Sequence, residues 1–340
     1  MRPTHVRRVA PAALLLTLAG LAAACTGSAP SGARSPSPSS AQVATPSGSA
    51  VTPTPTAPTH LVVHQTRVRL PFPVAREALV PLGRGRFLSA GGLVAGDSST
   101  GQAFVLDTRR LATHPAPAMP VPVHDTAGVL LGGRPLVVGG GNSSEQDVVQ
   151  ARAGSGWHVI GHLPQPRSDL SVALLGSRIL VLGGYDGSTT AMPQILASVD
   201  GTSWRPVGTL PVPMRYAAVA VVDGHVWLFG GERAGVEQRA VQEVDPSGHA
   251  RVVARLPVPL GHGAAIPIGG KVLLAGGRLG PDQPTDRMWW FDPHTRRFTP
   301  AGHLPVPLAD TAVALDGDRA WLVGGETPGL TDRVVSLSLR

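Results

Sequence analysis

Gly-Gly doublets stand at six positions with nearly constant spacing, and this recurrence constrains the fold more than any other feature. Successive doublets begin 48, 44, 47, 46 and 48 residues apart. A period of 20 to 50 residues is typical of solenoids, propellers and other repeat architectures. The doublets begin at Gly91, Gly139, Gly183, Gly230, Gly276 and Gly324.

A second motif keeps the same register. A Leu-Pro-x-Pro or Met-Pro-x-Pro sequence begins 20 residues before the doublet in five repeats and 21 residues before it in the first. Two independent motifs that hold one register six times indicate a single repeated structural unit. These motifs begin at Leu70, Met119, Leu163, Leu210, Leu256 and Leu304.

Each repeat predicts four short strands. In the fourth repeat, small residues at 217–222 lead into the turn Asp223-Gly224, which suits a two-residue hairpin. The apolar run 226–229 then enters the doublet, and short runs of this kind favour strands buried on both faces. A variable loop and two further strands complete the unit. We interpret the doublets as structural, because no helix follows them and glycine allows close approach of two backbones.

These repeats resemble the kelch repeat of β-propellers, and the resemblance covers residues 61–340, with about 47 residues per repeat. Three repeats carry an aromatic residue six positions before the Leu-Pro, and two depart from this pattern with Thr113 and Ala250. The resemblance implies an all-β fold, a six-bladed β-propeller of four-stranded blades. The aromatic residues are Trp157, Trp204 and Phe298.

The last repeat is short and leaves room for a strand from the N-terminal side. Residues 304–340 suffice for three strands, while residues 61–69 read as a strand that no repeat uses. We expect this strand to complete the sixth blade and close the ring, which leaves no unpaired edge at the seam.

The first 60 residues predict export. A basic segment, 1–8, precedes an apolar segment, 9–24, that is shorter than the ~20 residues of a membrane span. We therefore assign residues 1–24 to a signal peptide. Cys25, the only cysteine, follows three alanines and resembles the lipidated cysteine of bacterial lipoproteins, although that motif prefers Leu where Ala22 stands.

This resemblance implies a lipid anchor on Cys25, a Ser/Thr/Pro/Ala-rich tether over 25–60, and a location on the outer side of the cytoplasmic membrane. A freely secreted product is the alternative.

Several functions are disfavoured by composition. The formal charge is +7, but Arg2, Arg7 and Arg8 fall in the signal peptide and the other basic residues are scattered, so we expect no nucleic-acid partner.

No nucleophile or phosphate-loop motif is present, and the lack of a cysteine after Cys25 excludes copper radical oxidases of the kelch type. Strand spacing places His158 and His162 ~13 Å apart, too far for one metal. We expect neither a metal nor a cofactor, and a cation held by Asp125, Asp169 and Asp310 is the weaker alternative.

The repeat register yields a candidate site. The sixth residue after the start of each Pro motif is polar and should begin the innermost strand, so propeller geometry places these residues around one mouth of the central channel. They are Arg76, Asp125, Asp169, Tyr216, His262 and Asp310. The loops after the doublets should open on the same face and bring Asn142, Tyr185, Glu232, Arg278 and Glu326.

Two functions fit this pattern. The first is a monomeric recognition module that binds a protein, peptide or glycan without chemistry. The second is a carbohydrate-active enzyme, such as a sugar epimerase or mutarotase, with His262 and a carboxylate as acid and base. The first is favoured because no spacing demands catalysis, and fold alone does not define function.

The six polar positions also have a purely structural interpretation, in which they bond loop amides. If they bind a ligand, replacing His262 or Arg278 with alanine should weaken binding and leave the melting temperature unchanged. The opposite face consists of short turns such as 223–224 and 269–270, which offer few side chains.

Overall fold

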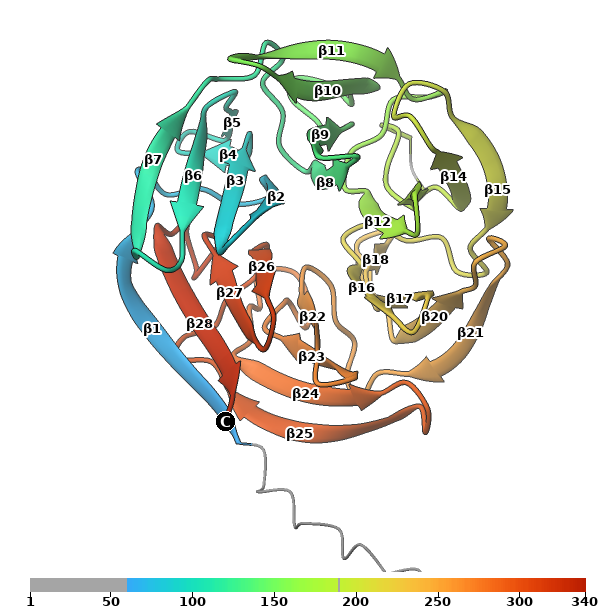
Figure 1. The fold of residues 1–340 in the computed structure, drawn as a ribbon. Helices are drawn as coiled ribbons and strands as arrows, with labels where there is room; N and C mark the ends of the chain where they lie inside the picture. Colours follow the sequence, from blue (N-terminus) through green and yellow to red (C-terminus); the bar gives the residue numbers. More distant parts are fainter. Residues whose placement is uncertain (1–59, 189) are drawn as a thin grey trace, which may run out of the picture. The chain divides into compact units, whose positions relative to one another are not determined.

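The predicted repeats form six four-stranded antiparallel sheets in the computed structural model, which describes residues 60–188 and 190–340 (Figure 1). The sheets surround a central axis as the blades of a β-propeller, and successive blades follow one another in chain order. The part of the chain that is described contains no helix able to cross a membrane. The predicted signal peptide, the lipidation site Cys25 and the tether up to residue 59 lie outside the described residues.

Every blade has the same order of strands from the axis outward. Blade 1 contains β2 (Ala78–Gly83), β3 (Arg86–Ala90), β6 (Ala103–Asp107) and β7 (Ala112–Ala116). Blade 2 contains β8 (Ala127–Leu131), β9 (Arg134–Val138), β10 (Val148–Ala153) and β11 (Gly156–His162). Blade 3 contains β12 (Ser171–Leu175), β13 (Arg178–Leu182), β14 (Gln194–Ser198) and β15 (Arg205–Thr209).

The second half repeats this plan. Blade 4 contains β16 (Ala218–Val222), β17 (His225–Phe229), β20 (Ala240–Val244) and β21 (Ala250–Arg255). Blade 5 contains β22 (Ala264–Ile268), β23 (Lys271–Ala275), β24 (Arg287–Asp292) and β25 (Arg297–His303). Blade 6 contains β26 (Ala312–Asp316), β27 (Arg319–Val323), β28 (Arg333–Leu339) and β1 (Leu61–Arg69). Two loops after the doublets carry small ribbons, β4 (Leu93–Val94) with β5 (Ser98–Ser99) and β18 (Glu232–Arg233) with β19 (Val236–Glu237).

The ring is closed as the sequence predicts. β1 lies antiparallel to β28, from Leu61 opposite Leu339 to Arg69 opposite Arg333, and so becomes the outer strand of blade 6 (Figure 1). The Thr66 hydroxyl donates a hydrogen bond of 2.9 Å to the Val334 carbonyl within this pair. Strands from the two ends of the described chain therefore share one sheet.

The Pro motifs fix the connections between blades. Their first residue is buried in all six repeats, with no more than 5% exposed. In two blades a buried glutamine also holds the motif: the Gln150 amide bonds both the N–H and the carbonyl of Val121, and Gln242 does the same with Val212. The chain that leads from an outer strand to the next inner strand is thus anchored by burial and by paired hydrogen bonds.

The glycine doublets join neighbouring blades through their backbones. Gly230 and Gly231 have φ angles of +61° and +94°, and the Gly231 N–H donates to the Leu260 carbonyl, which precedes blade 5, at 2.8 Å. A Cβ on Gly230 would collide with that same carbonyl. The bond recurs at all six doublets with lengths of 2.8 to 2.9 Å, and the other acceptors are the carbonyls of Val74, Val123, Arg167, Met214 and Leu308. The structural interpretation of the doublets is therefore confirmed.

The closing strand should control the stability of the whole propeller. We expect deletion of residues 61–69 to abolish the cooperative thermal unfolding transition, because it exposes the edge of β28 and the apolar surface between blades 6 and 1. The milder change Thr66→Val should lower the free energy of unfolding by about 1 kcal/mol, the value of one buried hydrogen bond. Circular dichroism melts measure both, and a truncated chain that melted at the parent's temperature would contradict this role.

Candidate functional site

The six predicted channel residues occupy one unusual backbone conformation. Their φ angles lie between 51° and 60°, in the left-handed region, although none is a glycine. Each stands two residues before its innermost strand, so the expectation that it begins that strand is wrong by two positions. The reason is that a left-handed φ cannot continue into a β ladder. These ring residues are Arg76, Asp125, Asp169, Tyr216, His262 and Asp310.

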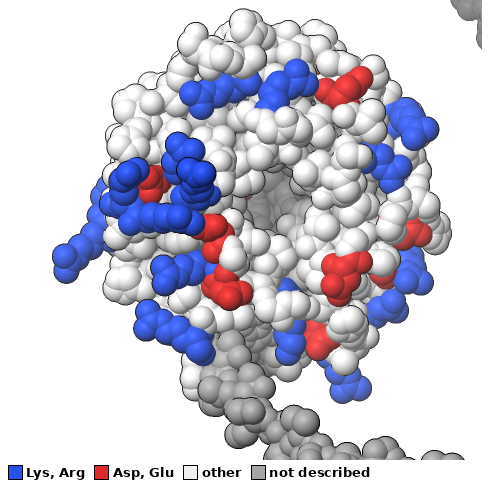
Figure 2. Space-filling model, viewed as in Figure 1, with Lys and Arg blue, Asp and Glu red and all other residues white. Residues whose placement is uncertain are grey.

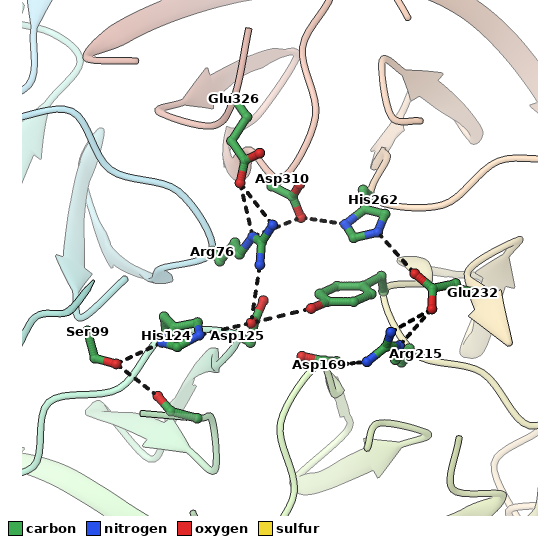
Figure 3. Close-up of polar contacts among 12 residues, drawn as sticks. Arg76, Ser99, His124, Asp125, Asp169, Arg215, Glu232, His262, Asp310 and Glu326 are labelled. Carbon is green, nitrogen blue, oxygen red and sulfur yellow. Dashed lines mark hydrogen bonds and ion pairs between the residues drawn. The ribbon is translucent and has the colours of Figure 1, made fainter. Parts of the chain in front are cut away.

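The backbone links the ring residues from blade to blade. In five of the six steps, the N–H of one ring residue donates to the carbonyl of the ring residue of the preceding blade, at 2.9 to 3.1 Å. Such backbone conformations persist only where the surroundings impose them, and they gather at functional sites. The imposed turn brings all six side chains to one hollow, and Figure 3 shows five of them pointing toward one another.

Asp310 and His262 form the centre of a buried ion-pair network (Figure 3). The His262 Nδ1 lies 2.7 Å from the Asp310 carboxylate, and its Nε2 lies 3.7 Å from Glu232. Burial alone would lower the pKa of His262, but the contacts with Asp310 and Glu232 outweigh it and raise the pKa to about 9. His262 is therefore an imidazolium at neutral pH.

Arg76 and Arg215 extend the network at the mouth. Arg76 lies between Glu326, Asp125 and Asp310, at 3.0, 3.5 and 3.6 Å. Arg215 pairs with Asp169 at 3.1 Å and with Glu232 at 2.6 Å (Figure 3). Since each guanidinium joins carboxylates of different blades, the charges hold neighbouring blades in a fixed relation at the mouth.

Tyr216 packs among these charges. Its ring stacks on the His262 imidazole with 3.9 Å between centroids, and its hydroxyl donates to the Asp125 carboxylate at 3.4 Å. The Arg215 guanidinium lies over the rings of both Tyr216 and Tyr185. Two aromatic faces are thus placed beside hydrogen-bonding groups at the opening.

Two aspartates of the ring hold their protons more tightly than usual. Burial is the main cause that raises the pKa of Asp125 and that of Asp169, and the Asp125 charge raises the pKa of Asp169 further. Arg76 and Arg215 oppose these shifts only in part. The mouth therefore contains carboxyl groups that exchange protons closer to neutral pH than an exposed aspartate does.

Glu77, the residue after Arg76, is a buried carboxyl group that the sequence reasoning did not select. It is 5% exposed, and neither of its carboxyl oxygens has a hydrogen-bond partner within the described ranges. Burial is the main cause that raises the pKa of Glu77 to about 8; its own backbone N–H opposes the shift, and the charge of Asp310 adds to it. Glu77 is therefore mostly a neutral acid at pH 7.

Two adjoining hollows define what we call the channel-mouth site. The axial hollow has a volume of about 150 Å³ and is lined by the six ring residues together with Glu77. A side hollow of about 290 Å³ shares Asp125, Asp169 and Tyr216 with it, and its other polar walls include His124, Asn142, Glu145, Tyr185 and Arg215. The two hollows are therefore neighbours that share three polar walls.

The residues predicted from the loops take two different places. Asn142 and Tyr185 line the side hollow. Glu232, Arg278 and Glu326 lie behind the ring and hold it through ion pairs, including Arg278 with Asp310 at 2.9 Å. Backbone bridges bring these loops to the mouth. In each bridge, the residue that follows the doublet pairs with the residue that precedes the ring residue. They include Ser168–Tyr185, Arg215–Glu232, Gly261–Arg278 and Ala309–Glu326.

Arg215 and His124 were missed, and a signal existed for both. Each immediately precedes a ring residue, and the bridge at that position brings it to the mouth. His124 bonds Ser99 at 2.7 Å and lies 3.3 Å from Asp125 (Figure 3). A search for polar residues on both sides of the ring position would have found them, and Glu77 as well.

The expectation that His262→Ala leaves stability unchanged is not supported. The His262 side chain is 4% exposed between two carboxylates, and removal of one partner of a buried ion pair typically costs about 3 to 5 kcal/mol. Arg278 likewise separates Asp310 from Glu326. Variants at the rim therefore separate binding from folding better than these two.

Within the described ranges, no group of three or more His, Cys, Asp or Glu side chains is arranged to hold a metal ion. In comparisons with known proteins, no family model matches the chain and no curated protein is significantly similar to it. The class of protein is therefore defined by the structure itself: a six-bladed β-propeller with a polar channel mouth.

The unpartnered acid should give stability a particular dependence on pH. Folding raises the pKa of Glu77 from 4.5 to about 8. The contribution of Glu77 to the free energy of unfolding is therefore most favourable below pH 4.5, where the group is protonated in both the folded and the unfolded state, and this contribution is lost as pH rises through 8. Glu77→Gln should therefore be more stable than the parent at pH 8 by roughly 3 kcal/mol or more, with little difference at pH 4.

Denaturant unfolding at several pH values measures this difference, with Glu145→Gln in the rim loop as control. The control should keep the parent's pH profile. A Glu77→Gln profile parallel to the parent's from pH 4 to 9 would show that Glu77 is ionised in the folded protein.

Proposed function

We propose that this protein is a recognition module whose channel-mouth site binds a glycan. The observation that carries the proposal is the open hollow at the mouth, whose walls bring together carboxyl, guanidinium, imidazole and phenol groups from all six blades. A ligand with several hydroxyl groups can exchange hydrogen bonds with these donors and acceptors, and a few well-placed polar groups are what fixes the orientation of a ligand in a pocket.

The protonation of these groups favours hydroxyl ligands. A neutral Glu77 both donates and accepts, as a hydroxyl group does, whereas an ionised carboxylate only accepts. Tyr185, in the wall of the side hollow, adds an aromatic ring on which the apolar face of a sugar can pack. A peptide or a protein segment with hydroxyl side chains fits the same chemistry and is the second ligand class.

The rigidity of the mouth supports recognition. Arg76, Arg215 and His262 are already paired with carboxylates before any ligand arrives. A ligand therefore does not have to order these side chains, and this lowers the entropic cost of binding.

We place this module outside the cytoplasmic membrane, tethered through a lipid on Cys25, as a kelch-like lipoprotein. The support is the apolar segment 9–24 followed by the only cysteine of the chain, and the Ser/Thr/Pro/Ala-rich stretch that separates it from β1. Free secretion is the alternative.

A sugar epimerase or mutarotase is the second candidate function. The raised pKa values of Glu77 and Asp169 favour it, since both groups can transfer a proton near neutral pH. It is less well supported because His262, the expected base, is already protonated and has both ring nitrogens close to carboxylates.

Binding to a glycan array, followed by titration calorimetry, tests the proposal. Tyr185→Ala at the rim should weaken binding of a glycan hit roughly tenfold or more, because it removes an aromatic contact and loosens Arg215. His294→Ala, an exposed side chain on the β24–β25 turn, is the matched control and should bind as the parent does. Equal affinities of the parent and Tyr185→Ala for every hit would contradict a ligand site at the mouth.

NMR of the same sugars separates the two functions. Unchanged anomer and epimer ratios over time are expected for a recognition module. Conversion that Glu77→Gln abolishes would instead establish the enzyme.

A further inference from the structure

A large basic hollow lies at the seam between blades 6 and 1, away from the channel mouth. It has a volume of about 1050 Å³, and its walls include Arg67, Arg109, Arg319 and Arg340. A second hollow of about 400 Å³ shares Arg109 and adds Arg84, Arg86 and Arg110. We call these seven exposed arginines the basic seam surface. Figure 2 shows basic side chains gathered to the left of the channel, over blades 1 and 6 as Figure 1 places them.

This surface accounts for the whole net charge of the propeller. Residues 60–340 contain 25 of the 29 basic residues, since Arg2, Arg7, Arg8 and Arg34 precede them, and all 22 acidic residues, which gives +3. The two hollows hold seven arginines and three acids, Asp107, Asp316 and Asp318, which gives +4. The rest of the domain therefore carries a net charge of −1, and the positive potential is local to the seam.

The acids within the surface neutralise only a minority of its arginines. Asp107 accepts from the backbone of Arg109 and Arg110 and pairs with the Arg110 side chain at 3.2 Å. Asp316 lies 3.5 Å from Arg109, whose side chain is still 63% exposed. Arg67, Arg84, Arg86 and Arg319 remain open to an anionic partner.

An apolar residue projects from the same surface. Leu111 follows Arg109 and Arg110 in the β6–β7 turn, has a φ of 51° and is 48% exposed. A leucine held at a turn tip beside arginines suits an interface whose outer layer is anionic and whose next layer is apolar. A soluble polyanion gives such a leucine no apolar partner.

The chain enters the propeller at this surface. The backbone of His60 exchanges two hydrogen bonds with Arg340, at 2.6 and 2.9 Å, and Arg340 lines the large hollow.

The channel mouth lies at the other end of the blades, because Arg76 precedes strand β2 and Arg84 follows it. Blade order is clockwise in Figure 1 and anticlockwise in Figure 3, so the two views look at opposite faces.

We propose that the basic seam surface docks on a membrane of anionic phospholipids and turns the channel mouth away from that membrane. The proposal rests on the tethered location proposed above, which brings the seam close to lipid headgroups. Arginines would bind headgroup phosphates and Leu111 would enter the interfacial layer. Docking would then orient the recognition site outward instead of leaving it free to rotate on the tether.

Vesicle sedimentation of the chain from residue 25 onward tests this proposal. All samples carry Cys25→Ser so that no acyl chain contributes, and vesicles contain phosphatidylcholine with or without phosphatidylglycerol. Removal of three charges in Arg67→Gln/Arg84→Gln/Arg109→Gln should weaken binding to the anionic vesicles roughly tenfold or more, because each basic residue at an anionic surface contributes favourably. Added salt should weaken binding of the parent in the same way.

The matched control is Arg205→Gln/Arg255→Gln/Arg297→Gln, which removes three exposed charges from the outer faces of blades 3, 4 and 5. It should bind the anionic vesicles as the parent does. All samples begin at residue 25, so that the apolar segment 9–24 does not contribute, and a difference between the two triple variants then reflects the replaced arginines.

Three results would overturn the proposal: equal losses in both triple variants, no dependence on phosphatidylglycerol, or binding of soluble polyphosphate without binding of vesicles. Glycan binding at the mouth is measured on the same variants and should not change. Failure of membrane docking is thereby distinguished from failure of the proposed recognition function.

Discussion

One backbone hydrogen bond, repeated six times, underlies the whole structure: the bond from the second glycine of each doublet to a carbonyl of the next blade. The bond requires the two backbones to approach so closely that a Cβ on the first glycine would collide with the accepting carbonyl. Both glycines also take positive φ angles, which other residues adopt at a cost. The doublet therefore sets how each blade is placed against its neighbour.

The polar channel follows from this placement. The acceptor carbonyl lies two residues before the ring residue in each repeat, so fixing the carbonyl also fixes the left-handed turn that directs the ring side chain inward. Six polar side chains then meet in one small space, and most of their charge is paired across blades. Among the described residues of the mouth, Glu77 and one oxygen of Asp125 remain without a hydrogen-bond partner.

The fold could be predicted from the sequence because its determinants are local and periodic. The doublet, the Pro motif and the hairpin turns recur in one register, and the spare strand at 61–69 identified the closure. The ring positions followed from the same register. The sequence did not predict that the ring residues stand two positions before the innermost strand. The left-handed turn that causes this offset is imposed by the neighbouring blade and has no signature in the composition.

Features that depend on several segments were harder to predict. The sequence shows scattered arginines, yet β1, β27, the end of the chain and two turns of blade 1 bring seven of them together. The expectation of a face with few side chains is accordingly wrong at blade 1, where the turns carry Arg84, Arg109 and Arg110. Arg167 is a similar case: a buried guanidinium bonds the carbonyls of Gly183 and Gln194 where five other blades have an apolar residue.

The stability of two glycine-to-alanine variants tests the role of the doublet most directly. Gly230 and Gly224 have similar positive φ angles, +61° and +73°, but only a Cβ on Gly230 meets another blade, while one on Gly224 meets nothing within 4 Å. Backbone strain alone should cost about 1 kcal/mol at either position. We predict that Gly230→Ala lowers the free energy of unfolding by several times as much as Gly224→Ala. Equal losses at the two positions would contradict the account.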